Sequence, residues 1–158
     1  MYNSSHSDLP PSIAVVSKGV VHWLGGKPNP RLPLESDFDI IKAGTAGISK
    51  SSVDHLAIHM GISKKSMAED ILDLSIKTLE RKRPQDKLDK KTSAHALEIA
   101  RLMQHAYEVF EDENKVRKWI NTENKALNSM RPLQLFDTLT GLNMVSDILT
   151  RIEEGVYS

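Results

Sequence analysis

The stretch SKKSMAEDILDLSIKTLERKR, residues 63–83, decides the fold class, because it contains two short helical patterns joined by a tight turn. The first pattern, SMAEDIL, is apolar on one face, whereas the second, SIKTLERKR, begins with small polar residues and ends strongly basic. Only the dipeptide Asp73–Leu74 separates them. Two helices in this arrangement are typical of a helix-turn-helix, in which the second helix enters the major groove of DNA.

The ends of both helices are marked in the sequence. Either Ser63 or Ser66 can cap the first helix, and Glu69 follows Ser66 at the spacing of a capping box. The second helix is expected to start at Ser75 and to continue until Pro84, since proline cannot continue a helix. The apolar contacts of the first helix are assigned to Met67, Ile71 and Leu74.

The turn between the helices carries Asp73, where helix-turn-helix units usually carry glycine. Aspartate adopts a left-handed backbone more readily than most residues, but less readily than glycine. The sequence therefore leaves the geometry of this turn open.

A helix that reads DNA must point its first turns at base edges and place cations beside the phosphates. Helical spacing turns Ile76 and Leu79 of the second helix toward the core. A merely solvated basic face is the alternative interpretation, because basic helix faces are common. The candidate base-reading residues are Ser75, Lys77, Thr78 and Arg81, and the candidate phosphate-binding residues are Lys64, Lys65, Lys82 and Arg83.

The chain of 158 residues has a formal net charge of zero, whereas a dedicated nucleic-acid binder is usually basic. The charge is nevertheless unevenly distributed. Residues 77–91 hold seven basic and three acidic side chains, a net charge of +4, and residues 108–114 hold four acidic side chains and no basic one. This distribution indicates a chain with two different surfaces.

The composition excludes several classes of protein. The chain has no cysteine, which excludes disulfide scaffolds, cysteine-ligated zinc fingers and thiol catalysis, and which suits a cytoplasmic location. No apolar run approaches the roughly 20 residues of a membrane span, and the first residues do not resemble a secretory signal. We expect a cytoplasmic protein that makes no membrane contact.

The rest of the chain is mostly helical in pattern, so the expected fold class is all-α. Residues 1–12 hold too few apolar side chains for an ordered structure, and residues 12–24 can form either a short strand or a buried helix. The turn-rich residues 25–33 are expected to form a loop. The other predicted helices cover residues 36–44, 49–60, 92–110, 112–120 and 140–154, and a further one is expected to begin near Pro132.

The sequence contains no arrangement typical of an active site. His55 and His59 have the spacing of a chelating pair on a helix, but no third ligand motif accompanies them, so we expect no metal site. No glycine-rich phosphate loop follows a strand, and no nucleophile stands beside a base. We expect neither an enzyme nor a cofactor.

The C-terminal third contains more specific elements, and together residues 106–158 resemble the Xre/MbcA/ParS toxin-binding domain of bacterial antitoxins. A helix-turn-helix directly before this domain is the usual antitoxin arrangement, so the resemblance extends back to about Ser49. For residues 1–48 we recognise no resemblance to a known family. The matching elements are EVFED (108–112), Trp119, NTENKAL (121–127), RPLQLFDT (131–138) and the ending GLNMVSDILTRIEEGVYS (141–158).

The resemblance implies an antitoxin of the RES–Xre type. Its partner would be a RES-domain toxin, an ADP-ribosyltransferase-like protein that consumes NAD. The family antitoxin binds the toxin through its C-terminal domain, covers the active-site cleft, and together with the toxin represses its own operon through the helix-turn-helix. We also expect a homodimer. Asp73 and the neutral net charge depart from the family pattern, and both bear on DNA affinity.

The toxin contacts are expected at the end of the chain. A cleft that binds the phosphates of NAD should be lined with arginines, and Glu153 and Glu154 would pair with them. Gly155 would end the last helix, and Tyr157 would be an amphipathic anchor. Thus, the candidate toxin-binding residues are Arg151, Glu153, Glu154, Gly155, Tyr157 and Ser158.

We therefore expect three parts: a partly disordered N-terminal extension over residues 1–48, a helix-turn-helix domain over residues 49–107, and a small helical toxin-binding domain over residues 108–158. In the third part, Asn121 and Asn124 are expected to satisfy loop backbone. The alternative is a stand-alone helix-turn-helix transcriptional regulator whose C-terminal helices only dimerise. A RES-like protein encoded in the adjacent reading frame would distinguish the two.

Overall fold

A computed structural model describes residues 19–27 and 33–155 of the chain. Within these ranges the regular structure is helical, and the two β contacts are isolated bridges that join Ser49 to Lys87 and Asn124 to Met130. The predicted all-α class is therefore confirmed. Of the undecided residues 12–24, residues 19–23 are helical, whereas the predictions for residues 1–12 and for the tail beyond residue 155 lie outside the described residues.

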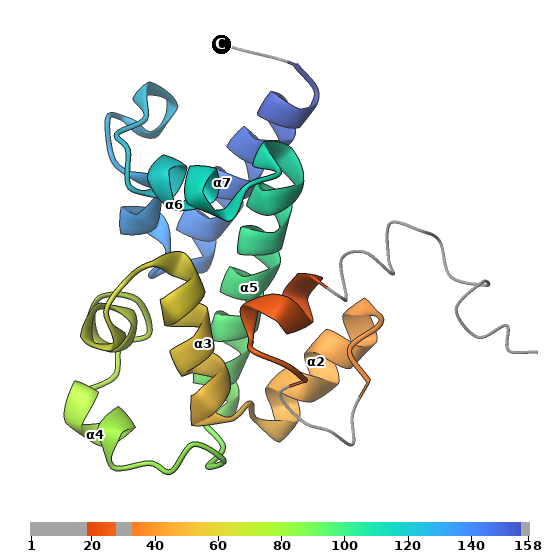
Figure 1. Cartoon of the computed structure of the whole chain (residues 1–158). Helices are drawn as coiled ribbons and strands as arrows, with labels where there is room; N and C mark the ends of the chain where they lie inside the picture. Colours follow the sequence, from red (N-terminus) through yellow and green to blue (C-terminus); the bar gives the residue numbers. More distant parts are fainter. Residues whose placement is uncertain (1–18, 28–32, 156–158) are drawn as a thin grey trace, which may run out of the picture.

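The helices follow one another with short connections (Figure 1). A helical turn at residues 19–23 precedes them. The elements are α2 (Asp37–Ala46), α3 (Lys50–Met60), the π-helix η1 (Ser66–Ile71), α4 (Ile76–Glu80), α5 (Lys90–Phe110), α6 (Glu113–Ile120), the 3₁₀ turns η2 (Lys125–Leu127) and η3 (Pro132–Leu135), and α7 (Leu139–Glu153).

Helix α2 begins where the sequence predicts but does not stop at the predicted glycine. Ser36 and Asp39 form a capping box at its start. The helix continues through Gly44 and is capped by Gly47, whose φ is 90°. A residue with a side chain would be strained at this backbone angle. A Cβ on Gly47 would also lie 2.5 Å from the carbonyl oxygen of Leu88. The glycine that the backbone requires is therefore Gly47, and the predicted end at Gly44 is wrong.

The start of the helix-turn-helix uses one of the two predicted caps. The hydroxyl of Ser63 accepts the backbone N–H of Ser66 at 3.0 Å, so Ser63 caps this segment. The capping box predicted for Ser66 and Glu69 is wrong, because the hydroxyl of Ser66 instead donates to Asp70 at 3.0 Å. Glu69 reaches forward to the next helix, as described below.

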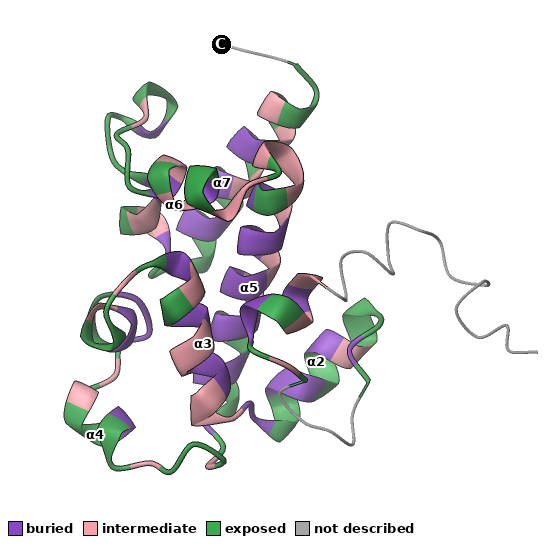
Figure 2. Cartoon of the chain, viewed as in Figure 1, coloured by how far each residue is buried: buried purple, intermediate pink, exposed green. Residues whose placement is uncertain are grey.

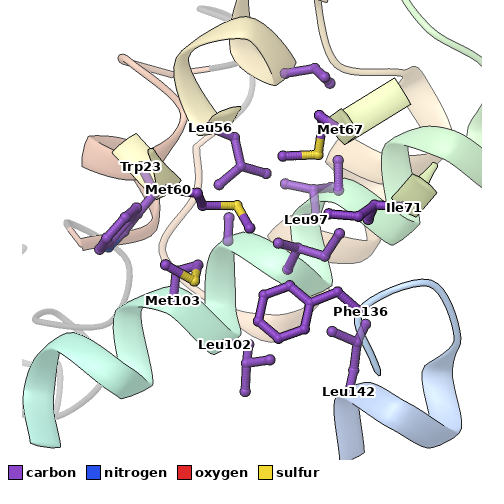
Figure 3. Close-up of a cluster of buried hydrophobic side chains, with 14 of the residues drawn as sticks. Trp23, Leu56, Met60, Met67, Ile71, Leu97, Leu102, Met103, Phe136 and Leu142 are labelled. Carbon is purple, nitrogen blue, oxygen red and sulfur yellow. The ribbon is translucent and has the colours of Figure 1, made fainter. Parts of the chain in front are cut away.

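Helix α5 runs through the middle of the molecule, with α2 and α3 packed beside its first half and α6 and α7 beside its second half (Figure 1). Its buried side chains belong to one hydrophobic core, shown in Figure 3, which reaches from Trp23 near the N-terminus to Leu142 in α7. The helix continues without a break through the predicted domain boundary at residue 107. The helix-turn-helix and the C-terminal elements therefore share a core built on α5.

The C-terminal elements cover the second half of α5 through apolar contacts and one specific hydrogen bond. Phe136 is fully buried, and its carbonyl oxygen accepts a hydrogen bond from Nε2 of His95 in α5 at 2.7 Å. Gly141 lets α7 approach η3, since a Cβ there would lie 2.0 Å from the carbonyl oxygen of Leu135. In this part of the core Leu127, Pro132 and Phe136 are buried, and Trp119, Leu133 and Leu135 are half-buried.

Asp89 caps the central helix, and its removal is expected to destabilise the protein. Its Oδ1 accepts the backbone N–H of Thr92 at 2.8 Å, and its hydrogen bonds with Thr92 hold the pKa of Asp89 below its ordinary value. Asp89→Ala should therefore lower the free energy of unfolding by about 1 kcal/mol at neutral pH. Because the folded-state pKa is depressed, this contribution is present above the unfolded-state pKa and is lost as the pH falls through the folded-state pKa.

Urea unfolding at neutral pH and at about pH 3 measures this contribution, with Asp89→Asn as the control, since asparagine caps helices about as well as aspartate. Asp89→Asn should retain most of the stability at neutral pH. A difference between wild type and Asp89→Ala that does not shrink in acid would contradict the assigned role of the carboxylate.

Candidate functional site

Helix α4 presents the predicted base-reading residues to solvent. Leu79 is buried and Ile76 is half-buried, so both face the core as the helical spacing predicts. Figure 2 shows that most of the remaining α4 surface is exposed. The exposed residues are Ser75, Lys77, Thr78 and Arg81.

The turn before α4 is held by two features. Asp73 has a φ of 55°, so aspartate does adopt the left-handed backbone that the turn requires. Oε2 of Glu69 accepts the backbone N–H of Ile76 at 3.1 Å and thereby caps α4 from the preceding helix. Ser75 precedes α4 without a side-chain capping bond. Its hydroxyl is therefore not committed to capping the helix.

Helix α4 is shorter than predicted and ends at Glu80 instead of continuing to Pro84. Proline disfavours a helical backbone at the residue before it, Arg83, so the helix must end earlier. Arg83 instead forms a turn with Asp86, whose Oδ2 accepts the Arg83 backbone N–H at 2.8 Å. The backbone and side-chain hydrogen bonds from Arg83 hold the pKa of Asp86 below its ordinary value. Lys82 therefore lies beyond the helix and is half-buried.

The two lysines at the start of the helix-turn-helix have different surroundings. Nζ of Lys64 lies 3.7 Å from Oδ2 of Asp54 in α3, so its charge is partly engaged within the chain. Lys65 is exposed. A phosphate would have to compete with Asp54 for Lys64, whereas Lys65 offers its charge to solvent.

The end of α7 places the candidate toxin-binding residues that the structure describes at the surface. Arg151, Glu153 and Glu154 are exposed, while Ile152 is half-buried against the core. Oε2 of Glu153 lies 3.2 Å from Nε2 of His105 in α5, a pairing that the sequence did not indicate. Gly155 follows with a φ of 74°, as predicted for the residue that ends the helix. The remaining candidates, Tyr157 and Ser158, lie outside the described residues.

A hollow of about 280 Å³ lies beside this surface, between α5 and α7. Its rim includes the exposed apolar side chain of Leu139, which is 63% exposed. Polar lining is supplied by Glu98, Arg101, Gln104, His105, Glu108, Asn143 and Ser146.

Asn121 and Asn124 satisfy local backbone groups, as predicted. Nδ2 of Asn121 donates to the carbonyl oxygen of Arg117 at 2.8 Å, and Oδ1 of Asn124 accepts the backbone N–H of Ala126 at 2.9 Å. These two side chains therefore shape the connection between α6 and η3.

His22, His59 and Glu113 converge from three distant segments, which sequence spacing could not reveal. His22 lies in the first helical turn, His59 in the last turn of α3, and Glu113 at the start of α6. Nδ1 of His59 lies 3.5 Å from Oε2 of Glu113, and Nε2 of His22 pairs with Oε1 of the same carboxylate. Burial raises the pKa of Glu113, but the hydrogen bond with His22 and the charges of both histidines lower it by more.

His55 and His59 both lie on α3, but of the two only His59 belongs to this cluster. Nδ1 of His55 donates to the carbonyl oxygen of Ser51 at 2.8 Å and lies outside the cluster. The neighbours of His59 are instead His22, whose ring centroid is 4.4 Å away, and Glu113.

Two family models match the chain in succession. The "Antitoxin Xre-like helix-turn-helix domain" matches residues 39–101, which include α3, η1 and α4. The "Antitoxin Xre/MbcA/ParS C-terminal toxin-binding domain" matches residues 105–155, which include α6 and α7. The chain belongs to the Xre/MbcA/ParS-type antitoxins.

A curated relative of this antitoxin agrees with the two matches. The chain is 26% identical over 129 residues to the antitoxin Xre of Yersinia enterocolitica, an alignment that covers 80% of this chain and 86% of the relative. The two matched domains imply DNA and a toxin protein as partners. Within the described residues, no helix of the antitoxin is long and apolar enough to cross a membrane.

Proposed function

We propose that this antitoxin inhibits a NAD-consuming RES-domain toxin by covering the toxin's active-site cleft with its C-terminal element. The observation that carries the proposal is the end of α7, where exposed Arg151, Glu153 and Glu154 precede the left-handed Gly155. This segment lies within the match to the toxin-binding domain. Two carboxylates presented beside a turn suit a cleft whose arginines bind the phosphates of NAD.

The negative charge of the last turn of α7 also favours binding to a cationic partner. Glutamates at the C-terminal end of a helix are repelled by the partial negative charge of the helix dipole. Glu153 is partly compensated by His105, whereas no ion pair of Glu154 is found among the described residues. Arginines of a toxin cleft would supply the missing cation, and Tyr157 would anchor the contact.

We further propose that the antitoxin represses its own operon through α4. Ser75, Lys77, Thr78 and Arg81 would contact the bases, and Lys64, Lys65 and Lys82 would contact phosphates. The exposure of the first four residues supports this assignment. A homodimer would place two such helices in successive half-sites of the operator. In this proposal the antitoxin is a cytoplasmic regulator without enzymatic activity. Its three parts are the N-terminal extension (residues 1–48), the helix-turn-helix domain (49–107) and the toxin-binding domain (108–158).

Co-expression with the product of the adjacent reading frame tests the proposal. We expect the two proteins to co-purify and to elute together from a size-exclusion column at a fixed ratio. An antitoxin that elutes alone, and still binds its promoter, would contradict the proposed inhibition. That result would favour a stand-alone regulator whose C-terminal helices only dimerise.

A further inference from the structure

We propose that His22, His59 and Glu113 form a binding site for a transition-metal ion of the Zn²⁺ class. One potential ligand atom from each of the three side chains lies within 4.8 Å of the other two. Both histidines direct a ring nitrogen at the carboxylate of Glu113, as the two pairings described above show. The three groups come from the N-terminal turn, α3 and α6, so the fold itself brings them together.

The spacing of the ligand atoms is close to that of a zinc site. Zinc binds nitrogen and oxygen at about 2.1 Å in tetrahedral geometry, so two of its ligands lie about 3.4 Å apart. Nδ1 of His59 and Oε2 of Glu113 lie 3.5 Å apart, near this value. The third ligand can adjust, because the side chain of His22 is 53% exposed. A small rotation of this ring would complete a three-ligand site with a position left for water.

The donor set selects the class of metal. Two imidazole nitrogens and one carboxylate oxygen suit zinc, cobalt, nickel and copper, whereas magnesium and calcium prefer sites built from oxygen alone. Metal and protons would compete for the same imidazole nitrogens, so affinity should rise with pH as the ligands lose their protons.

Arg117 holds two of the ligands in place. Its NH1 donates to Oε2 of Glu113 at 3.2 Å and to the carbonyl oxygen of His59 at 2.9 Å. Hydrogen bonds of this kind orient metal ligands in proteins. The positive charge of Arg117 opposes a cation, so we expect weaker binding than in a structural zinc finger.

The buried side chain of Trp23 lies beside the rings of both histidines. Nε1 of Trp23 donates to Oε1 of Gln104 in α5 at 3.2 Å, and the indole ring meets the ring of His59 edge-on at 5.7 Å. Figure 3 shows Trp23 beside the core side chains of α3 and α5. His22 lies outside both family matches, whereas His59 and Glu113 lie in one match each. A bound metal would therefore tie the N-terminal segment to both domains.

Calorimetric titration of the full-length antitoxin with ZnCl₂ at neutral pH tests the site, and the visible absorption of added Co²⁺ reports the ligand geometry. We expect one ion per chain. His22→Ala and His59→Ala should each weaken Zn²⁺ binding at least about tenfold. Loss of a residue that only orients a metal ligand by a hydrogen bond already lowers metal affinity by that factor. The matched control is His55→Ala, which removes a histidine of the same helix and should leave the affinity unchanged.

Glu113→Gln keeps the shape of the carboxylate ligand, so it is the variant least expected to unfold the protein, and circular dichroism would detect unfolding in any of the variants. Glu113→Gln should also weaken Zn²⁺ binding while the helical signal is retained. Absence of binding by the wild-type chain would overturn the proposal. Equal affinity in wild type and His22→Ala would overturn it as well, because the ion would then be held elsewhere.

Discussion

Deletion of residues 151–158 is expected to abolish the protection of cells that express the proposed RES-domain toxin. The deletion removes every candidate toxin-binding residue, including both glutamates and Tyr157. The core of the antitoxin should survive, because the buried side chains of α7 end at Leu149. Growth and cellular NAD after induction of the toxin measure the effect, with antitoxin abundance determined in parallel by immunoblot.

The deletion should also reduce the stability of the antitoxin, which removal of a fully exposed tail would not do. Ile152 is half-buried and packs against the core, so the deletion should lower the free energy of unfolding by about 1 kcal/mol. Glu153→Lys with Glu154→Lys separates this effect from binding, since it keeps Ile152 and reverses both proposed contacts. The matched control is Asp147→Lys, an exposed acid on the same helix, which should leave protection intact. Full protection by the truncated chain would disprove the tail as the inhibitory element.

The second large effect is expected for Lys77→Ala with Arg81→Ala, which should weaken operator binding roughly a hundredfold. Both side chains are exposed on or directly after α4 and carry charges that DNA can neutralise. If both charges displace counterions, the slope of log affinity against log salt should fall by about 2. Fluorescence anisotropy with a labelled operator fragment at several salt concentrations measures both quantities.

The control for this pair is Lys115→Ala with Lys118→Ala, which removes two exposed charges from α6. It has the same change in net charge and should leave operator affinity nearly unchanged. The Lys77 and Arg81 variant should still bind the toxin. Unchanged affinity and salt slope in that variant would mean that α4 is not the DNA-reading helix.

Much of the fold follows from local signals in the sequence. Helix α3 begins after the cap Ser49 and ends at Gly61, whose φ is 71°, as predicted. Predictions failed where packing overrides a local signal. Gly44 is a residue type that often ends a helix, but α2 packs against α5 and continues beyond it to Ala46. By contrast, helix α4 ends at Glu80 for a local reason, because proline disfavours a helical backbone at Arg83, which instead forms a turn with Asp86.

The candidate sites differ in how far the sequence could predict them. The exposed face of α4 follows from helical spacing alone. Because Ile76 and Leu79 face the core, the residues between them must face solvent. The pairing of His105 with Glu153 joins residues far apart in the chain, and the cluster of His22, His59 and Glu113 joins three such segments. These contacts depend on the packing of α5 against its neighbours, which no single segment specifies.

Direct inhibition of the toxin by this antitoxin is best tested by NAD turnover of the purified, proposed RES-domain protein, titrated with the purified antitoxin. Turnover should fall linearly and stop at a fixed ratio of the two proteins, whereas antitoxin lacking residues 151–158 should leave it unchanged. Full turnover in the presence of excess intact antitoxin would show that the antitoxin does not inhibit the toxin by contact.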